Sequence, residues 1–256
     1  MQIRFALKRL GTCAAGAVLL GALACAQTPA AAQNPAPNAV KKVEAKGPVQ
    51  DWPGIGRYHE ANVNLAAPSA SENRVVFMGD SITDAWGKHF DKYFAGKPYI
   101  GRGISGQTTP QMVVRFRPDV IALGAKVVVI LAGTNDIAGN TGPETPEMIE
   151  DNFASMVDLA KANGIRVVLC SILPVYDYPW RRGLEPAPKI AALNQWLKEY
   201  AAKSGAVYVD YFSAMVDERP GCKAELCSDG VHPTDAGYTL MVPLVEKGIA
   251  EALAKN

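Results

Sequence analysis

The sequence predicts an α/β fold in which a five-stranded parallel sheet carries helices on both faces. Short apolar runs of strand length alternate five times with stretches of helical periodicity, a pattern typical of a parallel sheet with right-handed crossovers. One of these runs, 127–132, is apolar throughout, as expected for a strand that is buried on both faces. Ligands of such sheets gather at the carboxyl ends of the strands, so we expect the functional residues there.

The expected elements follow one another in a regular order. A helical segment over 52–65 comes first. Strands are expected at 75–78, 98–101, 127–132, 167–173 and 206–209. Helices are expected from 81 through 90 and at 110–123, 144–163, 188–203 and 235–253. Gly164 and Gly205 are placed as C-terminal helix caps, and Thr234 or Asp235 caps the start of the last helix.

Composition and charge narrow the class of protein. A chain of 256 residues predicts one domain of about 200 residues with an extension. Its content of 48% hydrophobic and 20% charged residues is that of an ordinary globular protein. The formal net charge is +1 and Lys and Arg form no block beyond the first residues, so we expect no nucleic-acid partner.

Residues 1–33 predict a secretory signal peptide. Three Lys or Arg residues among the first nine precede a small-residue apolar run over 13–26, and Ala-rich cleavage sites follow at 24–26 and 30–32. The run is shorter than the ~20 residues that a membrane span requires. We therefore expect an exported protein, periplasmic or secreted, with no stable membrane span. Lipid attachment at Cys25 stays open as an alternative.

Residues 34–50, rich in Ala, Pro, Asn and Lys, predict a flexible linker, which leaves 51–256 as the folded domain. Export would place that domain in an oxidising compartment. Cys222 and Cys227, five residues apart in a loop, are predicted to form a disulfide, with two free thiols as the alternative. Cys170 lies in an apolar strand and is expected to be buried.

Three short strings carry the chemistry: GDSI at 79–82, GTND at 133–136 and DGVH at 229–232. The first two end predicted strands, and the third lies in a loop shortly after the fifth strand. Together they supply a hydroxyl, an amide, an imidazole and a carboxylate at the same edge of the sheet. These are the groups that a serine esterase uses.

Ser81 is the predicted nucleophile. It directly follows an apolar strand and begins a helix, whose first N–H groups favour an anion. A simple helix-capping role is the alternative for an isolated GDS string. Ser105 is a second candidate, behind a weaker strand. The chain contains no G-x-S-x-G, so the nucleophile elbow of the α/β-hydrolases is absent.

Two residues are predicted to donate to an oxyanion. The segment 101–106 fits G-x-G-x-x-G, but no acidic residue ends a strand about 20 positions later, which argues against a dinucleotide site. We expect instead that Gly106 offers its backbone N–H, in addition to any role as a turn glycine. The amide of Asn135 follows a buried strand and can also donate, although an Asx-turn is the alternative. Asp136 is expected to hold the loop.

His232 is the predicted general base among three histidines. Asp229 lies three residues earlier, so its carboxylate can bind one imidazole nitrogen and leave the other to take the proton of Ser81. His59 and His89 lie in helical segments that are poorly placed for this role. A zinc site requires at least three protein ligands, and we find no candidate set for a metal.

The loop over 174–188 follows the fourth strand and should border the site. Tyr176, Tyr178 and Trp180 are candidates to stack on a sugar or to wall an acyl group. The adjacent Arg181–Arg182 pair could meet an anionic substrate. A solvent-facing loop that covers the sheet edge is the alternative.

These residues resemble the SGNH hydrolases, also called the GDSL family of esterases and lipases. The resemblance covers 75–235, and the four residue types that name the family fall at Ser81, Gly106, Asn135 and His232. Asp229 matches the orienting carboxylate. Ile82 replaces the Leu of the family name, which is a conservative change.

The resemblance implies a flavodoxin-like three-layer α/β/α sandwich and an oxyanion hole made by the N–H groups of Ser81 and Gly106 and the amide of Asn135. It also implies ester or thioester hydrolysis without a cofactor. The segments GTNDIAGNTG and DGVHPTDAGY look like a bacterial branch related to acetylhydrolases. We therefore expect a serine esterase for small-molecule or carbohydrate esters with short acyl groups. A lysophospholipase or thioesterase, an acyltransferase and a non-catalytic binding module are the alternatives.

Overall fold

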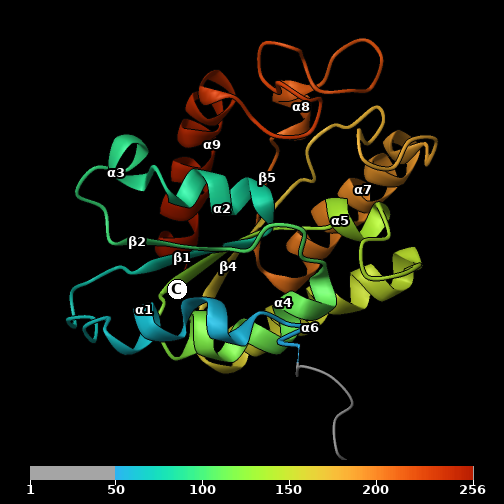
Figure 1. The fold of residues 1–256 in the computed structure, drawn as a ribbon. Coiled ribbons are helices and arrows are strands. Elements are labelled where there is room, and N and C mark those ends of the chain that lie inside the picture. Colours follow the sequence, from blue (N-terminus) through green and yellow to red (C-terminus); the bar gives the residue numbers. More distant parts are fainter. Residues whose placement is uncertain (1–49, 256) are drawn as a thin grey trace, which may run out of the picture. The chain divides into compact units, whose positions relative to one another are not determined.

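The computed structural model describes residues 50–255 and arranges them around one five-stranded parallel sheet (Figure 1). The strand order is β2-β1-β3-β4-β5. The strands are β1 Val75–Gly79, β2 Tyr99–Gly103, β3 Val127–Leu131, β4 Arg166–Cys170 and β5 Val207–Val209. This order places β1 between β2 and β3, so the segments that follow these three strands emerge side by side at one edge of the sheet.

Helices cover both faces of the sheet (Figure 1). One face carries α2 Ser81–Gly87, α3 Phe90–Tyr93, α8 Phe212–Met215 and α9 Asp235–Ala254. The other carries α4 Thr109–Phe116, the π-helical turn η2 Arg117–Ile121, α6 Pro146–Ala162 and α7 Pro186–Ser204. Before the sheet lie the 3₁₀ turn η1 Ile55–Tyr58 and α1 His59–Val63, and α5 Thr134–Ile137 follows β3. The predicted three-layer α/β/α architecture is confirmed.

The alternation of side chains along β1 explains why its sequence is apolar without interruption. Val75 and Phe77 pack in the core on the α2 and α9 side, whereas Val76 and Met78 pack in the core on the α4 and α6 side. All four are at most 2% exposed. A strand that is buried on both faces has no solvent-facing position for a polar residue.

The observed helices and strands agree with the sequence-based expectations except at the boundaries of a few of them. The helix expected over 81–90 is divided into α2 and α3, because α2 ends at Gly87. The helix expected over 110–123 changes to the π-helical turn at Arg117–Ile121. Pro118 has no backbone N–H with which to continue α-helical hydrogen bonding. The one-turn helices α5 and α8 were not expected from the sequence.

The predicted signal peptide at 1–33 lies outside the described residues, as does the predicted linker at 34–50 except for its last residue. The question of lipid attachment at Cys25 lies outside them as well. Within 50–255, no helix has the length and apolar character needed to cross a membrane.

Three glycines allow α2 to lie unusually close to β1 and β2. A Cβ on Gly103 would lie 2.1 Å from the backbone nitrogen of Asp84, and one on Gly79 would lie 2.1 Å from the Oγ1 of Thr83. A Cβ on Gly101 would lie 2.9 Å from the Cα of Gly87. The first and second glycines of the G-x-G-x-x-G segment therefore serve helix–strand packing.

We predict that Gly103→Ala lowers the free energy of unfolding by about 1–3 kcal/mol or more, because an added Cβ would overlap backbone atoms that cannot move independently. Gly87→Ala is the matched control, since its Cβ would meet the nearest atom at an ordinary 3.4 Å. Urea unfolding followed by circular dichroism measures both. A Gly103→Ala protein as stable as Gly87→Ala would contradict the close packing.

Candidate active site

A hydrogen-bonded chain joins Ser81, His232 and Asp229. The Oγ of Ser81 lies 2.9 Å from the Nε2 of His232. The Nδ1 of the same ring lies 2.7 Å from the Oδ2 of Asp229. Ser81 is the first residue of α2, directly after β1, whereas the other two residues lie on the loop between α8 and α9. The fold therefore brings together groups that are 151 residues apart.

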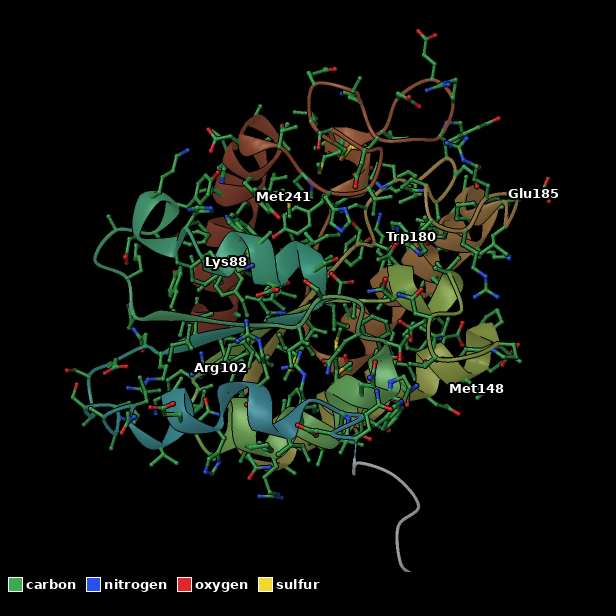
Figure 2. The ribbon with its side chains drawn as sticks, in the orientation of Figure 1. Lys88, Arg102, Met148, Trp180, Glu185 and Met241 are labelled. Atoms are coloured by element: carbon green, nitrogen blue, oxygen red, sulfur yellow. A yellow bond between two sulfur atoms is a disulfide. The ribbon has the colours of Figure 1, made fainter. Side chains whose placement is uncertain are left out.

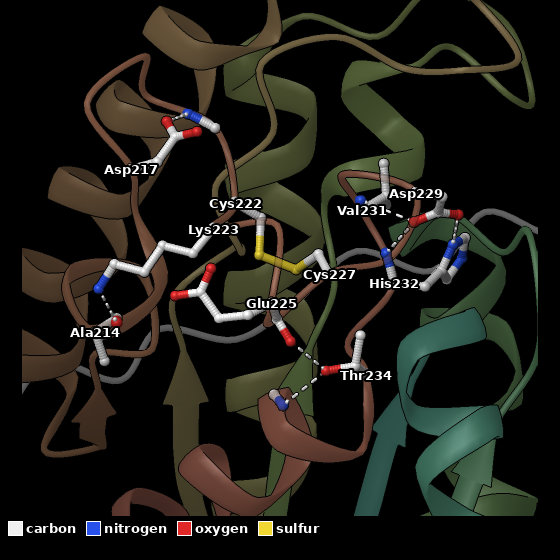
Figure 3. Close-up of a disulfide and its surroundings, with 12 residues drawn as sticks. Ala214, Asp217, Cys222, Lys223, Glu225, Cys227, Asp229, Val231, His232 and Thr234 are labelled. Atoms are coloured by element: carbon white, nitrogen blue, oxygen red, sulfur yellow. Dashed lines mark hydrogen bonds and ion pairs between the residues drawn. A yellow bond between two sulfur atoms is a disulfide. The ribbon is translucent and has the colours of Figure 1, made fainter.

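Asp229 is held as an acceptor by its own loop (Figure 3). Its Oδ1 accepts from the backbone N–H groups of Val231, at 2.9 Å, and of His232, at 2.7 Å. Partial burial acts to raise the pKa of Asp229, but these bonds and the bond from the imidazole outweigh it and hold the pKa below its usual range. An ionised carboxylate can only accept, so the imidazole donates from Nδ1 and its Nε2 is left to accept from the hydroxyl of Ser81.

The loop that carries Asp229 and His232 is anchored at several points (Figure 3). A disulfide joins Cys222 to Cys227. The hydroxyl of Thr234 donates to the carbonyl of Glu225 at 2.8 Å and accepts from the N–H of Gly237 in the first turn of α9, which it caps. These bonds hold Asp229 and His232 on a short segment between the disulfide and α9.

Gly106 and Asn135 are linked to each other by an amide that the sequence did not single out. Asn135 donates from Nδ2 to the carbonyl of Gln107 at 2.9 Å. Its Oδ1 accepts at 2.9 Å from the Nδ2 of Asn140, which also lies 3.3 Å from the carbonyl of Gly106. Asn140 thus fixes which way the Asn135 amide points. The available signal was its position five residues after Asn135 in the segment GTNDIAGNTG.

Gly106 has a backbone conformation that suits glycine. Its φ is +80°, and a Cβ at this position would meet nothing within 4 Å. The residue is exposed. The N–H of Ser81 also lacks an acceptor within its helix, because the first N–H groups of a helix have none.

Asp136 holds the loop, as its position suggested. Its Oδ1 accepts from the backbone N–H of Thr109 at 2.8 Å and from the hydroxyl of the same residue at 2.5 Å. Burial raises the pKa of Asp136 to about 7, against these two hydrogen bonds and with a further contribution from the nearby carboxyl of Glu144. The carboxyl therefore ties the Asn135 segment to the start of α4.

The alternative candidates for the nucleophile and the base do not join this hydrogen-bonded chain. The hydroxyl of Ser105 donates to the Oδ2 of Asp84 at 2.8 Å and has no imidazole partner among the described residues. His59 lies on α1, and His89 is an exposed residue before α3. Within 50–255, no group of three or more His, Cys, Asp or Glu side chains could hold a metal ion.

The aromatic loop before α7 presents a different surface from the one expected. Trp180 (Figure 2) is 46% exposed, and its ring centroid lies 6.2 Å from that of His232. Tyr176 is 58% exposed, with the guanidinium of Arg219 5.4 Å from its ring centroid. Tyr178 is fully buried and donates its hydroxyl to the carbonyl of Thr134 at 2.9 Å. Contrary to our prediction, it cannot stack on a substrate, and its ring packs against that of Trp180 instead, with the centroids 5.1 Å apart.

Arg181 is also occupied by the protein itself. It donates from Nη1 to the carbonyls of Ala138, at 2.6 Å, and Gly139, at 2.8 Å, just after α5. The neighbouring Arg182 is exposed. Of the two arginines considered for an anionic substrate, one therefore fixes the end of α5.

The parallel α/β/α architecture is that of the SGNH hydrolases. A model described as the GDSL-like Lipase/Acylhydrolase family matches residues 77–240, and the chain belongs to this family.

Solved structures and a curated relative agree with this assignment. A presumed acylhydrolase from Bacteroides fragilis aligns with a TM-score of 0.77 at 45% identity, over 80% of this chain and 99% of its own. A GDSL-like lipase from Bacteroides thetaiotaomicron aligns with a TM-score of 0.76 at 45% identity, over 78% and 98%. Esterase TesA of Pseudomonas aeruginosa is 27% identical over 183 residues, which cover 66% of this chain and 84% of TesA.

We predict that Asp136→Asn removes a pH-dependent loss of stability. The folded pKa near 7 exceeds the unfolded value of about 3.9, so the folded protein binds the extra proton between these values. The contribution of Asp136 to the free energy of unfolding is favourable below about pH 4 and is lost as pH rises through 7. The loss is at most about 1.4 kcal/mol for each unit by which the folded and unfolded pKa values differ. Urea unfolding between pH 4 and 8 should show the wild type losing stability relative to the variant.

Asp91→Asn, at an exposed residue on α3, controls for the removal of one negative charge. A stability difference between wild type and Asp136→Asn that stays constant from pH 4 to 8 would contradict the raised pKa.

Proposed function

We propose that this protein is a serine esterase with Ser81 as nucleophile, His232 as general base and Asp229 as the residue that orients and stabilises the imidazolium. The observation that carries the proposal is the continuous chain of hydrogen bonds from the Ser81 hydroxyl through His232 to Asp229. Membership of a lipase and acylhydrolase family supports the reaction class.

In the proposed reaction, the Oγ of Ser81 attacks the ester carbonyl while the Nε2 of His232 takes its proton. The same imidazolium then gives the proton to the departing alcohol. Water, deprotonated by His232, attacks the acyl-serine, and collapse of the second tetrahedral intermediate returns Ser81 and releases the acid. Asp229 stays ionised throughout, in keeping with its lowered pKa.

The N–H groups of Ser81 and Gly106 and the second Nδ2 hydrogen of Asn135 are the proposed oxyanion donors. One Nδ2 hydrogen of Asn135 binds the carbonyl of Gln107, so the amide is already oriented before a substrate arrives. Donors that are fixed in advance need no reorganisation as charge develops on the oxygen.

We further propose that short acyl groups, above all acetyl, are the preferred substrates, carried on small molecules or carbohydrates. The site is shallow, with the side chains of His232 and Asp229 35% and 40% exposed. The exposed ring of Trp180 beside His232 and the exposed Tyr176 offer flat surfaces for a sugar. Thioesters and lysophospholipids are the competing substrates.

Export to the periplasm or the cell exterior is part of the proposal. The predicted signal peptide at 1–33 and the disulfide between Cys222 and Cys227 support it, because structural disulfides persist mainly in oxidising compartments.

We predict that Ser81→Ala lowers kcat on p-nitrophenyl acetate by a factor of about 10⁴ or more, because the nucleophile is removed. Asn135→Ala should lower kcat by about 10²–10³ through the loss of one oxyanion donor. Steady-state kinetics measures both, and labelling by a fluorophosphonate probe should be lost in Ser81→Ala. His89→Gln, at an exposed histidine, is the control and should leave kcat nearly unchanged. A folded Ser81→Ala protein with wild-type turnover would exclude the proposed nucleophile.

The acyl preference has its own test. We expect kcat/KM on p-nitrophenyl esters to be highest for two to four carbons and to fall toward twelve, because the shallow site offers a long chain little apolar surface to bury. A maximum at eight carbons or more would reject the short-acyl proposal while leaving the nucleophile untouched. Acetylated oligosaccharides assayed beside lysophospholipids and acyl thioesters would then identify the natural class.

A further inference from the structure

One fully buried guanidinium lies beneath the site without touching it. Arg115 projects from α4, and its side chain has no exposed surface. Its Nη2 donates to the carbonyl of Gly79 at 2.9 Å, and its Nη1 donates to the carbonyl of Arg102 at 2.8 Å. Its Nε donates to the Oε1 of Gln107 at 2.5 Å. One side chain thus binds three separate segments at the carboxyl edge of the sheet.

Each of these segments leads directly to a residue of the proposed site. Gly79 ends β1 two residues before Ser81. Arg102 lies near the end of β2, which runs into the loop that carries Gly106. Gln107 follows Gly106, and its backbone carbonyl accepts from the amide of Asn135. Arg115 is therefore the common partner of the segment that leads to Ser81 and of the segment that bears Gly106, and it binds the side chain of the residue whose carbonyl accepts from the Asn135 amide.

A buried countercharge accompanies this guanidinium. The Oδ2 of Asp119, one turn later, accepts from the Nη1 of Arg115 at 3.0 Å, and its side chain is also fully buried. Its Oδ1 accepts from the Nδ2 of Asn62 at 2.7 Å. Burial acts to lower the pKa of Arg115 and the charge of Asp119 opposes it. A charged donor gives stronger hydrogen bonds to carbonyls than a neutral one.

We propose that Arg115 is a positioning residue for catalysis, setting the distance between the Ser81 segment and the Gly106 and Asn135 donors. This inference rests on the proposed esterase function. Arg115 touches no reacting atom, so its effect must pass through the geometry of the oxyanion donors. Such geometry matters most when the carbonyl oxygen gains charge, so loss of Arg115 lowers kcat and leaves KM nearly unchanged.

Lysine cannot take over this role. The three acceptors surround a planar group with donors in a fixed fork, whereas a lysine ammonium is a point charge on a flexible stem. Arg115→Lys keeps the charge beside Asp119 but cannot keep all three contacts. The substitution therefore separates the positioning role from the charge.

Arg74→Lys is a matched control. Arg74 is also buried, at 5% exposed, and donates to the carbonyls of Leu123, at 2.7 Å, and Ala66, at 2.9 Å. It lies just before β1, at the opposite end of the strand from Ser81. Both variants lose buried bonds from a guanidinium to backbone carbonyls, but only Arg115→Lys loses bonds to segments of the site.

The experiment measures kcat and KM on p-nitrophenyl acetate for both variants, together with inhibition by an alkylboronic acid. The boronic acid accepts the Oγ of Ser81 at boron while the proton passes to His232, which gives a tetrahedral anion that mimics the intermediate. We expect Arg115→Lys to lower kcat and boronate affinity by a similar factor of about 10–100, with KM changed less than threefold. Arg74→Lys should change kcat less than twofold.

A folded Arg115→Lys protein with wild-type kcat overturns the inference, and so does one whose KM rises while kcat and boronate affinity stay unchanged. An active Ser81→Ala protein would instead remove the proposed function itself. The two failures are therefore distinguishable.

Gln107 provides the test if Arg115→Lys does not fold. Gln107→Leu removes the acceptor for the Nε of Arg115, whereas Gln107→Glu keeps it, and both lose the bond from Nε2 to the carbonyl of Pro53. We expect Gln107→Leu to lower kcat about tenfold, and Gln107→Glu to recover most of it, since Glu keeps an acceptor for the Nε of Arg115 that Leu lacks. Equal kcat in these two variants would overturn the inference.

Discussion

The site depends on one contact across the chain, the hydrogen bond between Ser81 Oγ and His232 Nε2 at 2.9 Å. Its two ends are held by different means. Ser81 is fixed by its place between β1 and α2, with the Oδ1 of Asp80 accepting from the N–H of Ile82 at the helix start. His232 lies on a loop that is fixed by a disulfide and by bonds to α9. Neither end could shift by an ångström without breaking the bond, so both need rigid supports.

That requirement explains why the glycines gather around β1 and β2. Helix α2 must come close enough to the sheet for Ser81 to sit at its edge, and Gly79 and Gly103 remove the Cβ atoms that would hold the helix away. Pairing of β1 with β2 places their last backbone carbonyls side by side, and Arg115 donates to one carbonyl of each strand. The guanidinium adds charged donors to these buried carbonyls, of which that of Gly79 also accepts from the backbone N–H of Ile104 at 3.0 Å.

Much of this fold and site could be predicted from the sequence, and the exceptions have physical causes. Five apolar runs determined the sheet, and the strings around Ser81, Asn135 and His232 identified the residues that the fold brings together. The burial of Tyr178 could not be predicted, because an aromatic residue in a loop carries no periodic signal of the direction in which it points. Asn140 and Arg115 were missed for a related reason, since their partners include backbone carbonyls, which every residue has.

Burial and hydrogen bonding shift the pKa values of the carboxyl groups of the site in opposite directions. Asp229 is partly exposed and accepts three hydrogen bonds from its own loop, so its pKa lies below the usual range and it can stabilise an imidazolium. Burial raises the pKa of Asp80 to about 6 and that of Asp136 to about 7, because their bonds to Ile82 and Thr109 do not offset desolvation. The fold thus keeps a full negative charge on Asp229, where we propose that a proton is handled, and it uses the buried carboxyls as acceptors that hold the backbone in place.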